Sequence, residues 1–395
     1  MKKSVNVRRS DIMSVVRTEV QCYQSALVDR IRERGNVLDL PGLKIRLASA
    51  FGFCDGVQRA IEIAYATCRV FEGKRIWLIG EIIHNPEVNA QLDAQGLLHL
   101  PWNTDGKGYE HLTPEDVVII PAFGISTRLR RLLEERGVQL VDSTCGNVIK
   151  VWQRVRSYAG RGITSIIHGK VRHEESMATA SQSLGEDGKG NFLVIFCEKE
   201  AEMLAEYIRG RGDKEAFLSH FAGCYSPGFD PDVHLCDIGM ANQTTMLKGE
   251  TSRIQQMLRR AVEERDGSSE RFHAFDTICG ATQDRQQALL DLLEEPLDTM
   301  FIIGGYNSSN TTHLAHISSL RHPTFFVRDA SRLHSLSEVA AFDVGCKEEM
   351  LQQLPAVAAD TSRTWRVGIT AGASCPANVI EGVIRRLAEL RGCAL

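Results

Sequence analysis

Short apolar runs alternate with longer helical patterns along most of this chain. The runs that fit strands are LKIRLASA (43–50), RIWLIG (75–80), DVVIIPAFG (116–124), GVQLVDS (137–143), TSIIHG (164–169), FLVIFC (192–197), FHAFDTI (272–278), TMFIIGG (299–305) and RVGITAG (366–372). This alternation is typical of α/β layers built on parallel sheets. A chain of 395 residues is also too long for one ordinary core, so we expect two or three domains.

Two segments fall outside this alternation. Apolar residues recur at helical spacing before the first strand, which predicts a helical N-terminal extension over residues 1–43. Asp11 and Glu19 argue against reading the basic start as the presequence of a plastid-imported precursor. Residues 183–236 are rich in Gly, Asp and Pro, and we expect them to form surface loops inserted into a domain.

Composition excludes several classes of function. The net charge is −4, which gives no electrostatic footprint for nucleic acid. No apolar run approaches the roughly 18 residues that a membrane span needs, and the start lacks a secretory signal. We therefore expect a cytoplasmic protein that binds neither nucleic acid nor membranes.

Three of the eleven cysteines share one position, between a strand and a helix. Cys145 and Cys279 both follow Asp-(Ser/Thr)-x, precede Gly and lead into a helical pattern, and Cys54 repeats the order strand, cysteine, helix. Free N–H groups and the helix dipole favour thiolate at such a position. The plainer alternative is that small residues suit any crowded turn. The remaining cysteines lack this context and are read as apolar filler: Cys22, Cys68, Cys197, Cys224, Cys236, Cys346, Cys375 and Cys393.

Three thiolates from three α/β units could meet in a central cleft and hold a metal. Sulfur-only ligation favours zinc or an iron–sulfur cluster, and three ligands leave one metal position open. No Cys-x-x-Cys occurs, which disfavours zinc fingers, thioredoxin-like pairs and ferredoxin-type clusters.

Other polar residues collect where strands lead into helices. They are His84 in GEIIHNPEVN, His173, Glu174 and Glu175 in HGKVRHEES, Thr244 in ANQTTML, Ser308, Ser309 and Asn310 in GGYNSSNTTHL, and Ser374 in TAGASCP. Helix N-termini with neutral donors nearby are suited to anions, and phosphate is the natural ligand. Each cluster taken alone also fits ordinary helix capping.

Together these motifs, from GFCDGVQRAI to TAGASCP and in this order, resemble the hydroxymethylbutenyl diphosphate reductase family, in its plant and cyanobacterial branch. The resemblance implies three α/β units in a pseudo-threefold cloverleaf around a 4Fe-4S cluster, which Cys54, Cys145 and Cys279 would hold. We expect the units at 44–144, 145–275 and 276–395, after the extension. The implied reaction uses two electrons and two protons to convert 4-hydroxy-3-methylbut-2-enyl diphosphate into isopentenyl and dimethylallyl diphosphates.

The resemblance also assigns roles to residues. Glu175 matches the glutamate of a proton relay, and Thr244 matches the threonine beside the substrate's hydroxymethyl group. The residues matched to diphosphate binding are His84, His173, Ser308, Asn310 and Ser374, with Ser309 assisting. His173 is also expected among the catalytic residues with Glu175 and Thr244, and Thr244 among those that contact the substrate. A ferredoxin or flavodoxin is the implied electron donor.

Two positions depart from the bacterial pattern. Phe123 stands where bacterial members have a further histidine, and the motif His173-Glu174-Glu175 leaves the choice between its two glutamates to register alone. Two other functions stay open from the residues themselves, an iron–sulfur redox sensor without catalysis and a zinc site with three cysteines and a histidine.

Overall fold

The computed structural model describes residues 5–275 and 277–395. Asp276, which begins the expected third unit and is the acid of the second cysteine motif, lies outside the described residues, as do residues 1–4 of the extension. The chain divides into two compact units. The first contains Thr67–Ile82 and Gly96–Cys279, and the second contains Val7–Ala66, Ile83–Gln95 and Gly280–Leu395.

The first unit begins with a parallel four-stranded sheet in the order β4-β3-β5-β6. Its elements are β3 (Ile76–Ile79), β4 (Leu98–Leu100), β5 (Val117–Ile120), α5 (Thr127–Glu135) and β6 (Gln139–Asp142). All four residues of β5 are buried, as expected for a central strand covered on both faces. Leu129 and Leu133 of α5 pack into the same core.

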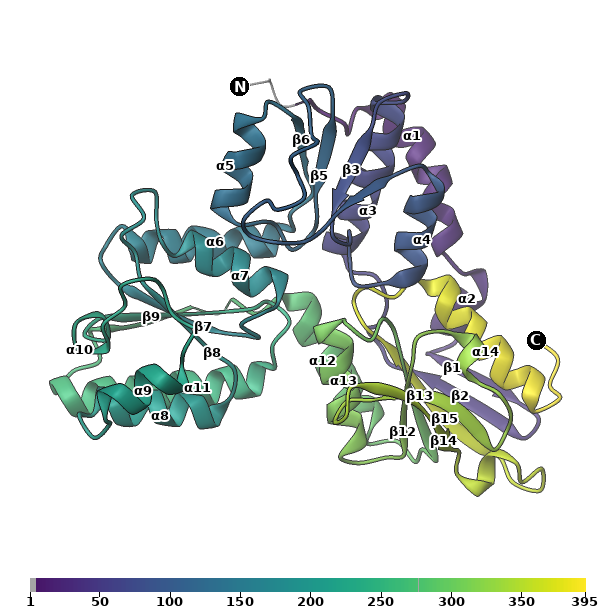
Figure 1. Cartoon of the computed structure of the whole chain (residues 1–395). Coiled ribbons are helices and arrows are strands. Elements are labelled where there is room, and N and C mark those ends of the chain that lie inside the picture. Colours follow the sequence, from purple (N-terminus) through teal and green to yellow (C-terminus); the bar gives the residue numbers. More distant parts are fainter. Residues whose placement is uncertain (1–4, 276) are drawn as a thin grey trace. The chain divides into compact units, whose positions relative to one another are not determined.

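A second parallel sheet of the first unit has the order β10-β9-β7-β8. Its strands are β7 (Thr164–His168), β8 (Phe192–Ile195), β9 (Ile238–Asn242) and β10 (Phe272–Ala274). Helices α6 (Gly146–Ala159) and α7 (Glu174–Gln182) cover one face, and α8 (Glu198–Ile208), α9 (Lys214–His220) and α11 (Lys248–Asp266) lie on the other (Figure 1). The short α10 (Pro231–His234) precedes β9.

The expectation of surface loops at 183–236 is wrong. This segment holds β8, which confirms the strand expected at 192–197, and three helices, α8, α9 and α10. Ala201, Leu204 and Ile208 recur at helical spacing on α8 and are buried in the core beneath the sheet, together with Phe217 and Phe221. The Gly- and Pro-rich pieces that suggested loops are the turns between these elements.

The second unit is built on a five-stranded sheet in the order β1-β2-β15-β11-β12. Its strands are β1 (Val37–Leu40), β2 (Leu43–Leu47), β11 (Thr299–Ile303), β12 (Thr324–Val327) and β15 (Trp365–Ala371). Helices α2 (Ala26–Glu33) and α14 (Ala377–Leu390) pack together on one face, and α12 (Gly280–Leu292) and α13 (Ser309–Ser319) on the other (Figure 1). The remaining elements are α1 (Ser10–Glu19), η1 (Val20–Tyr23), α3 (Asp55–Val70), α4 (Pro86–Ala94), η2 (Ala330–Arg332), the hairpin of β13 (Glu338–Asp343) and β14 (Glu348–Gln353), and η3 (Ala356–Ala358); α3 runs on into the first unit.

Strand pairing changes where two N-terminal segments belong. Strand β2, which we expected in the unit of residues 44–144, pairs in parallel with β15 instead. The extension contains the predicted helices and also β1, which pairs antiparallel with β2. Leu43, Ile45 and Leu47 alternate inward from β2, so this strand is buried in the core of the second unit.

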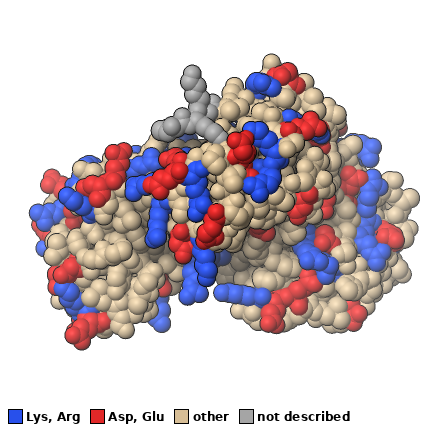
Figure 2. All heavy atoms as spheres, turned by 45° about the horizontal axis from the view of Figure 1, so that its top comes forward, with Lys and Arg blue, Asp and Glu red and all other residues tan. Residues whose placement is uncertain are grey.

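The parallel sheets covered by helices confirm the predicted α/β class. In the described part of the chain, every helix is too short or too polar to cross a bilayer. Acidic and basic side chains are interspersed over the face shown in Figure 2.

Candidate active site

The three singled-out cysteines all occupy helix starts. Cys145 is the N-cap of α6, and Cys54 and Cys279 directly precede α3 and α12. The strand-cysteine-helix order read from the sequence is therefore present at all three. Cys145 and Cys279 belong to the first unit and Cys54 to the second.

Cys279 is held by two neighbours in the first unit. Its backbone N–H donates to the carbonyl of Thr244 at 3.2 Å. The side-chain amide of Asn147 donates to its Sγ at 3.0 Å, which links Cys279 to the helix that begins at Cys145. Sequence reasoning missed Asn147, although its position two residues after Cys145 was a signal.

Glu175 and Thr244 form a buried pair beside this cysteine. One carboxylate oxygen of Glu175 accepts from the Thr244 backbone N–H at 2.6 Å, and the other accepts from the Thr244 hydroxyl at 3.0 Å. Glu175 is 2% exposed and Thr244 is 6% exposed. Because the Thr244 carbonyl accepts from Cys279, the backbone of Thr244 is hydrogen-bonded to both Glu175 and Cys279.

The two glutamates of the His-Glu-Glu motif differ in their surroundings. His173 is the N-cap of α7, and its Nδ1 accepts a hydrogen bond from the backbone N–H of Glu175 at 3.1 Å. An acceptor nitrogen carries no proton, so the ring presents N–H at Nε2. Glu174 Oε2 lies 3.8 Å from the same Nδ1 and its side chain is 29% exposed. Glu175 is therefore the glutamate that is buried against Thr244.

Phe123 packs on the edge of this site. Its ring meets that of His173 in a T-shaped arrangement, with 5.9 Å between ring centroids. This contact fixes the imidazole plane from one side without offering a hydrogen bond.

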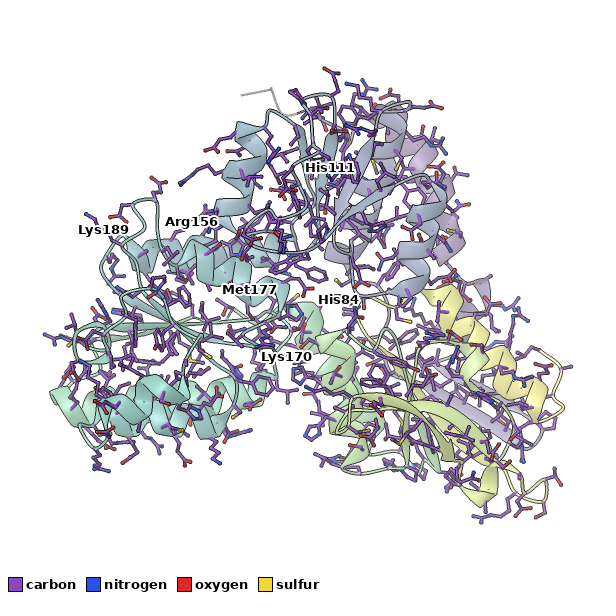
Figure 3. The ribbon with its side chains drawn as sticks, viewed as in Figure 1. His84, His111, Arg156, Lys170, Met177 and Lys189 are labelled. Atoms are coloured by element: carbon purple, nitrogen blue, oxygen red, sulfur yellow. The ribbon has the colours of Figure 1, made fainter. Side chains whose placement is uncertain are left out.

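In the second unit, His84, Ser308 and Ser374 come together. His84 lies on the segment that leads into α4 (Figure 3). The hydroxyl of Ser374 lies 3.2 Å from the His84 carbonyl oxygen and 3.4 Å from the Ser308 hydroxyl. Gly305, in the loop before α13, allows this loop to lie close to His84, because a Cβ at Gly305 would lie 2.5 Å from the His84 carbonyl oxygen. All three polar side chains are buried.

The start of α13 presents donors without partners. Ser308 caps this helix through its hydroxyl, which accepts from Thr311. Ser309 Oγ and Asn310 Nδ2 are buried and find no hydrogen-bond partner among the described residues. Asn310 is oriented by its own Oδ1, which accepts from the Ala373 backbone N–H at 2.9 Å. Buried donors at a helix N-terminus form a site that an anion would satisfy.

Asn307 is a further residue that the sequence did not single out. Its side-chain amide lies 3.2 Å from His84 Nδ1, so it holds the imidazole from the opposite loop. The position of the His84 ring is therefore set by a side chain from the loop that leads into α13.

The cysteines fit an iron–sulfur cluster in their donor chemistry. All three are sulfur donors at helix starts, and the Asn147 hydrogen bond to Cys279 Sγ is of the kind that tunes such clusters. Three sulfur ligands would leave one iron open to a substrate oxygen. A closed structural zinc site needs a fourth protein ligand.

Comparison with known proteins points to one family. The model of the LytB protein family matches residues 45–388. Two curated relatives are named 4-hydroxy-3-methylbut-2-enyl diphosphate reductase. The protein from Synechococcus sp. (strain RCC307) is 47% identical over 94% of this chain and 89% of its own length. The protein from Gloeobacter violaceus is 44% identical over 94% of this chain and 88% of its own length.

Solved structures share the fold. The E-1-hydroxy-2-methyl-but-2-enyl-4-diphosphate reductase of Plasmodium falciparum superposes with a TM-score of 0.64 at 19% identity, covering 87% of each chain. A structure of (E)-4-hydroxy-3-methyl-but-2-enyl diphosphate reductase, described as the terminal enzyme of the non-mevalonate pathway, gives a TM-score of 0.53 at 26% identity. It covers 87% of this chain and 99% of its own.

Proposed function

Because the chain belongs to the LytB protein family, we propose that it reduces 4-hydroxy-3-methylbut-2-enyl diphosphate to isopentenyl and dimethylallyl diphosphates. The allylic C–O bond breaks, two electrons and two protons enter, and the hydroxyl leaves as water. A family match over residues 45–388 and relatives that carry this name support the assignment.

The Glu175–Thr244 pair carries the mechanistic part of the proposal. A buried carboxylate bonded to a hydroxyl is suited to hold a proton and pass it to a leaving hydroxyl group. Thr244 would stand between Glu175 and the substrate oxygen, because its hydroxyl already contacts the carboxylate. The backbone N–H of Thr244 holds the other carboxylate oxygen and so fixes the orientation of Glu175.

We assign diphosphate binding to His84, Ser308, Ser309, Asn310 and Ser374, with His173 as a further contact. The unpartnered Ser309 and Asn310 donors support this role, because a diphosphate would satisfy them at no cost in broken bonds. Neutral donors at the start of α13 bind an anion through the helix N-terminus without a lysine or arginine.

We assign cluster ligation to Cys54, Cys145 and Cys279. A bound 4Fe-4S cluster would supply the two electrons and a Lewis-acidic iron for the substrate hydroxyl. An electron carrier of the ferredoxin or flavodoxin type would supply reducing equivalents. We also propose that the enzyme acts in the cytoplasm. Residues 44–144, 145–275 and 276–395 would be its three α/β units, except that β2 pairs within the sheet of the last of them.

Anaerobic turnover tests this function. The purified protein, with its iron content measured, is mixed with 4-hydroxy-3-methylbut-2-enyl diphosphate and a reduced viologen, and dye oxidation is followed. We expect turnover that falls on the order of a hundredfold or more in Glu175→Gln. Glu174→Gln is the matched control, because the Glu174 side chain is 29% exposed and it is Glu175 that accepts the Thr244 hydrogen bonds; it should keep near wild-type turnover.

Two results would overturn the assignment. No turnover by protein with a full iron complement would favour a redox sensor, and tight binding of diphosphate by that protein would then be unexpected. Turnover lost in Glu174→Gln but kept in Glu175→Gln would move the proton donor to Glu174. A colourless, iron-free protein from anaerobic purification would instead favour the zinc reading.

A further inference from the structure

Arg285 is a buried arginine whose guanidinium group donates hydrogen bonds to backbone carbonyls. It lies on α12, is 6% exposed, and donates to the carbonyl of Gly52 from Nε at 3.1 Å and from Nη2 at 2.6 Å. Its Nη1 donates to the carbonyl of Ala281 at 2.7 Å, in the first turn of the same helix. A two-pronged contact from a planar guanidinium fixes the position of its acceptor more tightly than one bond does.

The acceptor belongs to the loop that carries Cys54. Gly52 has a φ of 77°, a left-handed conformation that favours glycine, and lies two residues before the cysteine. Two long backbone bonds also hold the loop, from the Gly52 N–H to the Ala371 carbonyl at 3.4 Å and from the Cys54 N–H to the Ala373 carbonyl at 3.3 Å. The Arg285 contact at 2.6 Å is shorter than either, so this side chain contributes the firmest of these holds on the loop.

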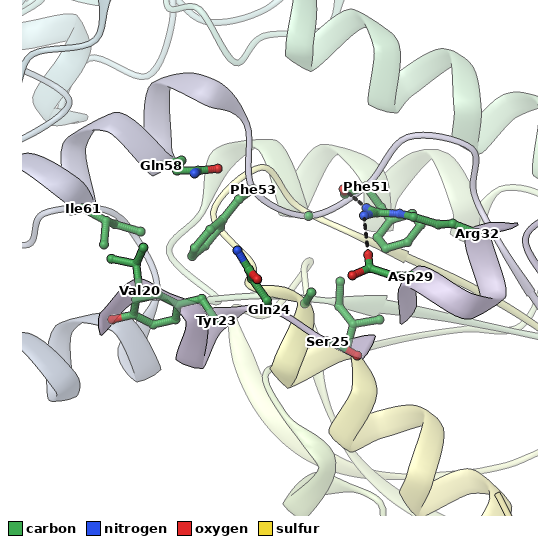
Figure 4. A pocket seen from close by; sticks show the side chains of 13 residues that line it. Val20, Tyr23, Gln24, Ser25, Asp29, Arg32, Phe51, Phe53, Gln58 and Ile61 are labelled. Atoms are coloured by element: carbon green, nitrogen blue, oxygen red, sulfur yellow. Dashed lines mark hydrogen bonds and ion pairs between the residues drawn. The ribbon is translucent and has the colours of Figure 1, made fainter. Parts of the chain in front are cut away.

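A second arginine touches the same loop from the N-terminal extension. Arg32 donates to the Phe51 carbonyl at 3.4 Å, stacks over the Phe51 ring at 4.4 Å, and pairs with Asp29 (Figure 4). These residues line a cavity of about 340 Å³ beside Phe53. The Arg32 side chain is 43% exposed, so its contact with the loop contributes less than that of the buried Arg285.

The helix that carries Arg285 begins directly after Cys279. We propose that Arg285 is a positioning residue that connects the Cys54 loop to α12. Its side chain would fix where Cys54, a proposed cluster ligand, lies relative to α12. The proposal rests on the proposed function only in naming the cysteines as cluster ligands. The hydrogen bonds from Arg285 to the loop are present in the chain without a cluster.

Alkylation of the metal-free protein tests the hold directly. Wild type and Arg285→Gln are treated with iodoacetamide, and the modification of each cysteine is followed by mass spectrometry. Loss of a charged, buried hydrogen bond should loosen the loop, so we expect Cys54 to react about tenfold faster in the variant. Cys145, in the other unit, serves as the internal reference and should keep its rate.

Arg391→Gln is the matched control. Arg391 lies in the same unit and also donates to backbone carbonyls, those of Gly42, Ala358 and Arg363, away from the Cys54 loop. Its loss should leave the Cys54 rate within about twofold of wild type, whereas general loosening of the unit would raise the rate in both variants. Arg285→Lys, which keeps one cationic donor, should give an intermediate rate and tests the role if Arg285→Gln fails to fold.

Reconstitution with iron and sulfide supplies the second readout. Arg285→Gln should bind less iron per chain and release it faster to a chelator than wild type or Arg391→Gln. An unchanged Cys54 rate in Arg285→Gln, or a rate raised equally by Arg391→Gln, would overturn the proposal. A wild-type protein that binds its cluster but does not turn over the substrate would instead contradict the proposed function. The alkylation test of Arg285 would remain valid.

Discussion

Thr244 contacts both carboxylate oxygens of Glu175, one through its backbone N–H and the other through its hydroxyl. Only the second contact depends on the threonine side chain. The two roles of Thr244, orienting the carboxylate and relaying a proton, can therefore be separated by substitution.

Thr244→Val keeps the shape of the side chain and the backbone bond but removes the hydroxyl. We expect kcat to fall about a hundredfold while the backbone N–H still holds Glu175, because a positioned acid–base group contributes on this order. Thr244→Ser, which restores the hydroxyl, should recover most of the rate. Equal rates for the valine and serine variants would show that the hydroxyl takes no part in proton transfer.

Ser309→Ala should weaken substrate binding. Each neutral donor to a charged diphosphate contributes enough that its loss should raise KM, or the Kd of unreactive pyrophosphate, about tenfold. Ser319→Ala, at the exposed far end of the same helix, is the control and should change neither value. A Ser309→Ala protein with wild-type pyrophosphate affinity would remove Ser309 from the site.

Asn147→Leu should shift the reduction potential of a bound cluster to more negative values. The Asn147 amide donates to Cys279 Sγ, and a hydrogen bond to a ligand sulfur stabilises the more negatively charged, reduced form. Redox titration followed by electron paramagnetic resonance would measure the shift. Gln153→Leu, at an exposed position on the same helix, should leave the potential unchanged.

The stability of the chain should depend on pH through His168. Burial lowers the pKa of His168 to about 4, against smaller opposing effects of the Phe196 backbone and Glu198. As pH falls, His168 of the unfolded chain is therefore protonated near pH 6.5, whereas His168 of the folded chain is protonated only near pH 4. The resulting stability, roughly 3 kcal/mol at most, is present above pH 6.5 and is lost as pH falls toward 4.

Denaturant unfolding at several pH values would measure this dependence. In His168→Gln the slope between pH 6.5 and 4 should flatten, although the variant is less stable at neutral pH because the contact to Thr251 changes. The exposed His316→Gln should retain the wild-type slope. A wild-type slope in His168→Gln would assign the acid sensitivity to other groups.

Gly239→Ala should destabilise the first unit. A Cβ at this position of β9 would lie 2.5 Å from the ring of Tyr158, which is buried on α6. Overpacking of this kind costs about 1–3 kcal/mol. Gly382→Ala is the control, because the nearest atom to its Cβ would be 3.6 Å away on a helix that favours alanine. Thermal unfolding would measure both variants, and equal melting temperatures for them would contradict the close contact between Gly239 and Tyr158.

The same glycine shows why part of the fold escaped prediction. Strand β9 lies between β7 and β10, yet its sequence IGMAN has no continuous apolar run, because Gly239 is required beneath Tyr158 and Asn242 ends the strand at the site. Strands such as β5 and β11, which are buried on both faces, are plain in the sequence because burial demands Val, Ile and Phe.

The candidate site was predictable where a residue's chemistry is unusual for its position. Cysteines and doubled hydroxyls at helix starts are such cases. Asn147, Asn307 and Arg285 are common residue types whose roles depend on contacts over long sequence separations, from Asn147 to Cys279 and from Arg285 to Gly52. No local pattern encodes such a contact, so these residues emerge only from the folded chain.

Strand β1 carries a last consequence for handling the protein. It pairs antiparallel along β2, from Val37 opposite Arg46 to Leu40 opposite Leu43, and so covers what would otherwise be an open sheet edge. A truncated protein that starts at Leu43 would expose the backbone donors and acceptors of β2 to neighbouring molecules. Deleting the extension should thus turn the paired edge of β2 into a template for intermolecular strand addition and aggregation.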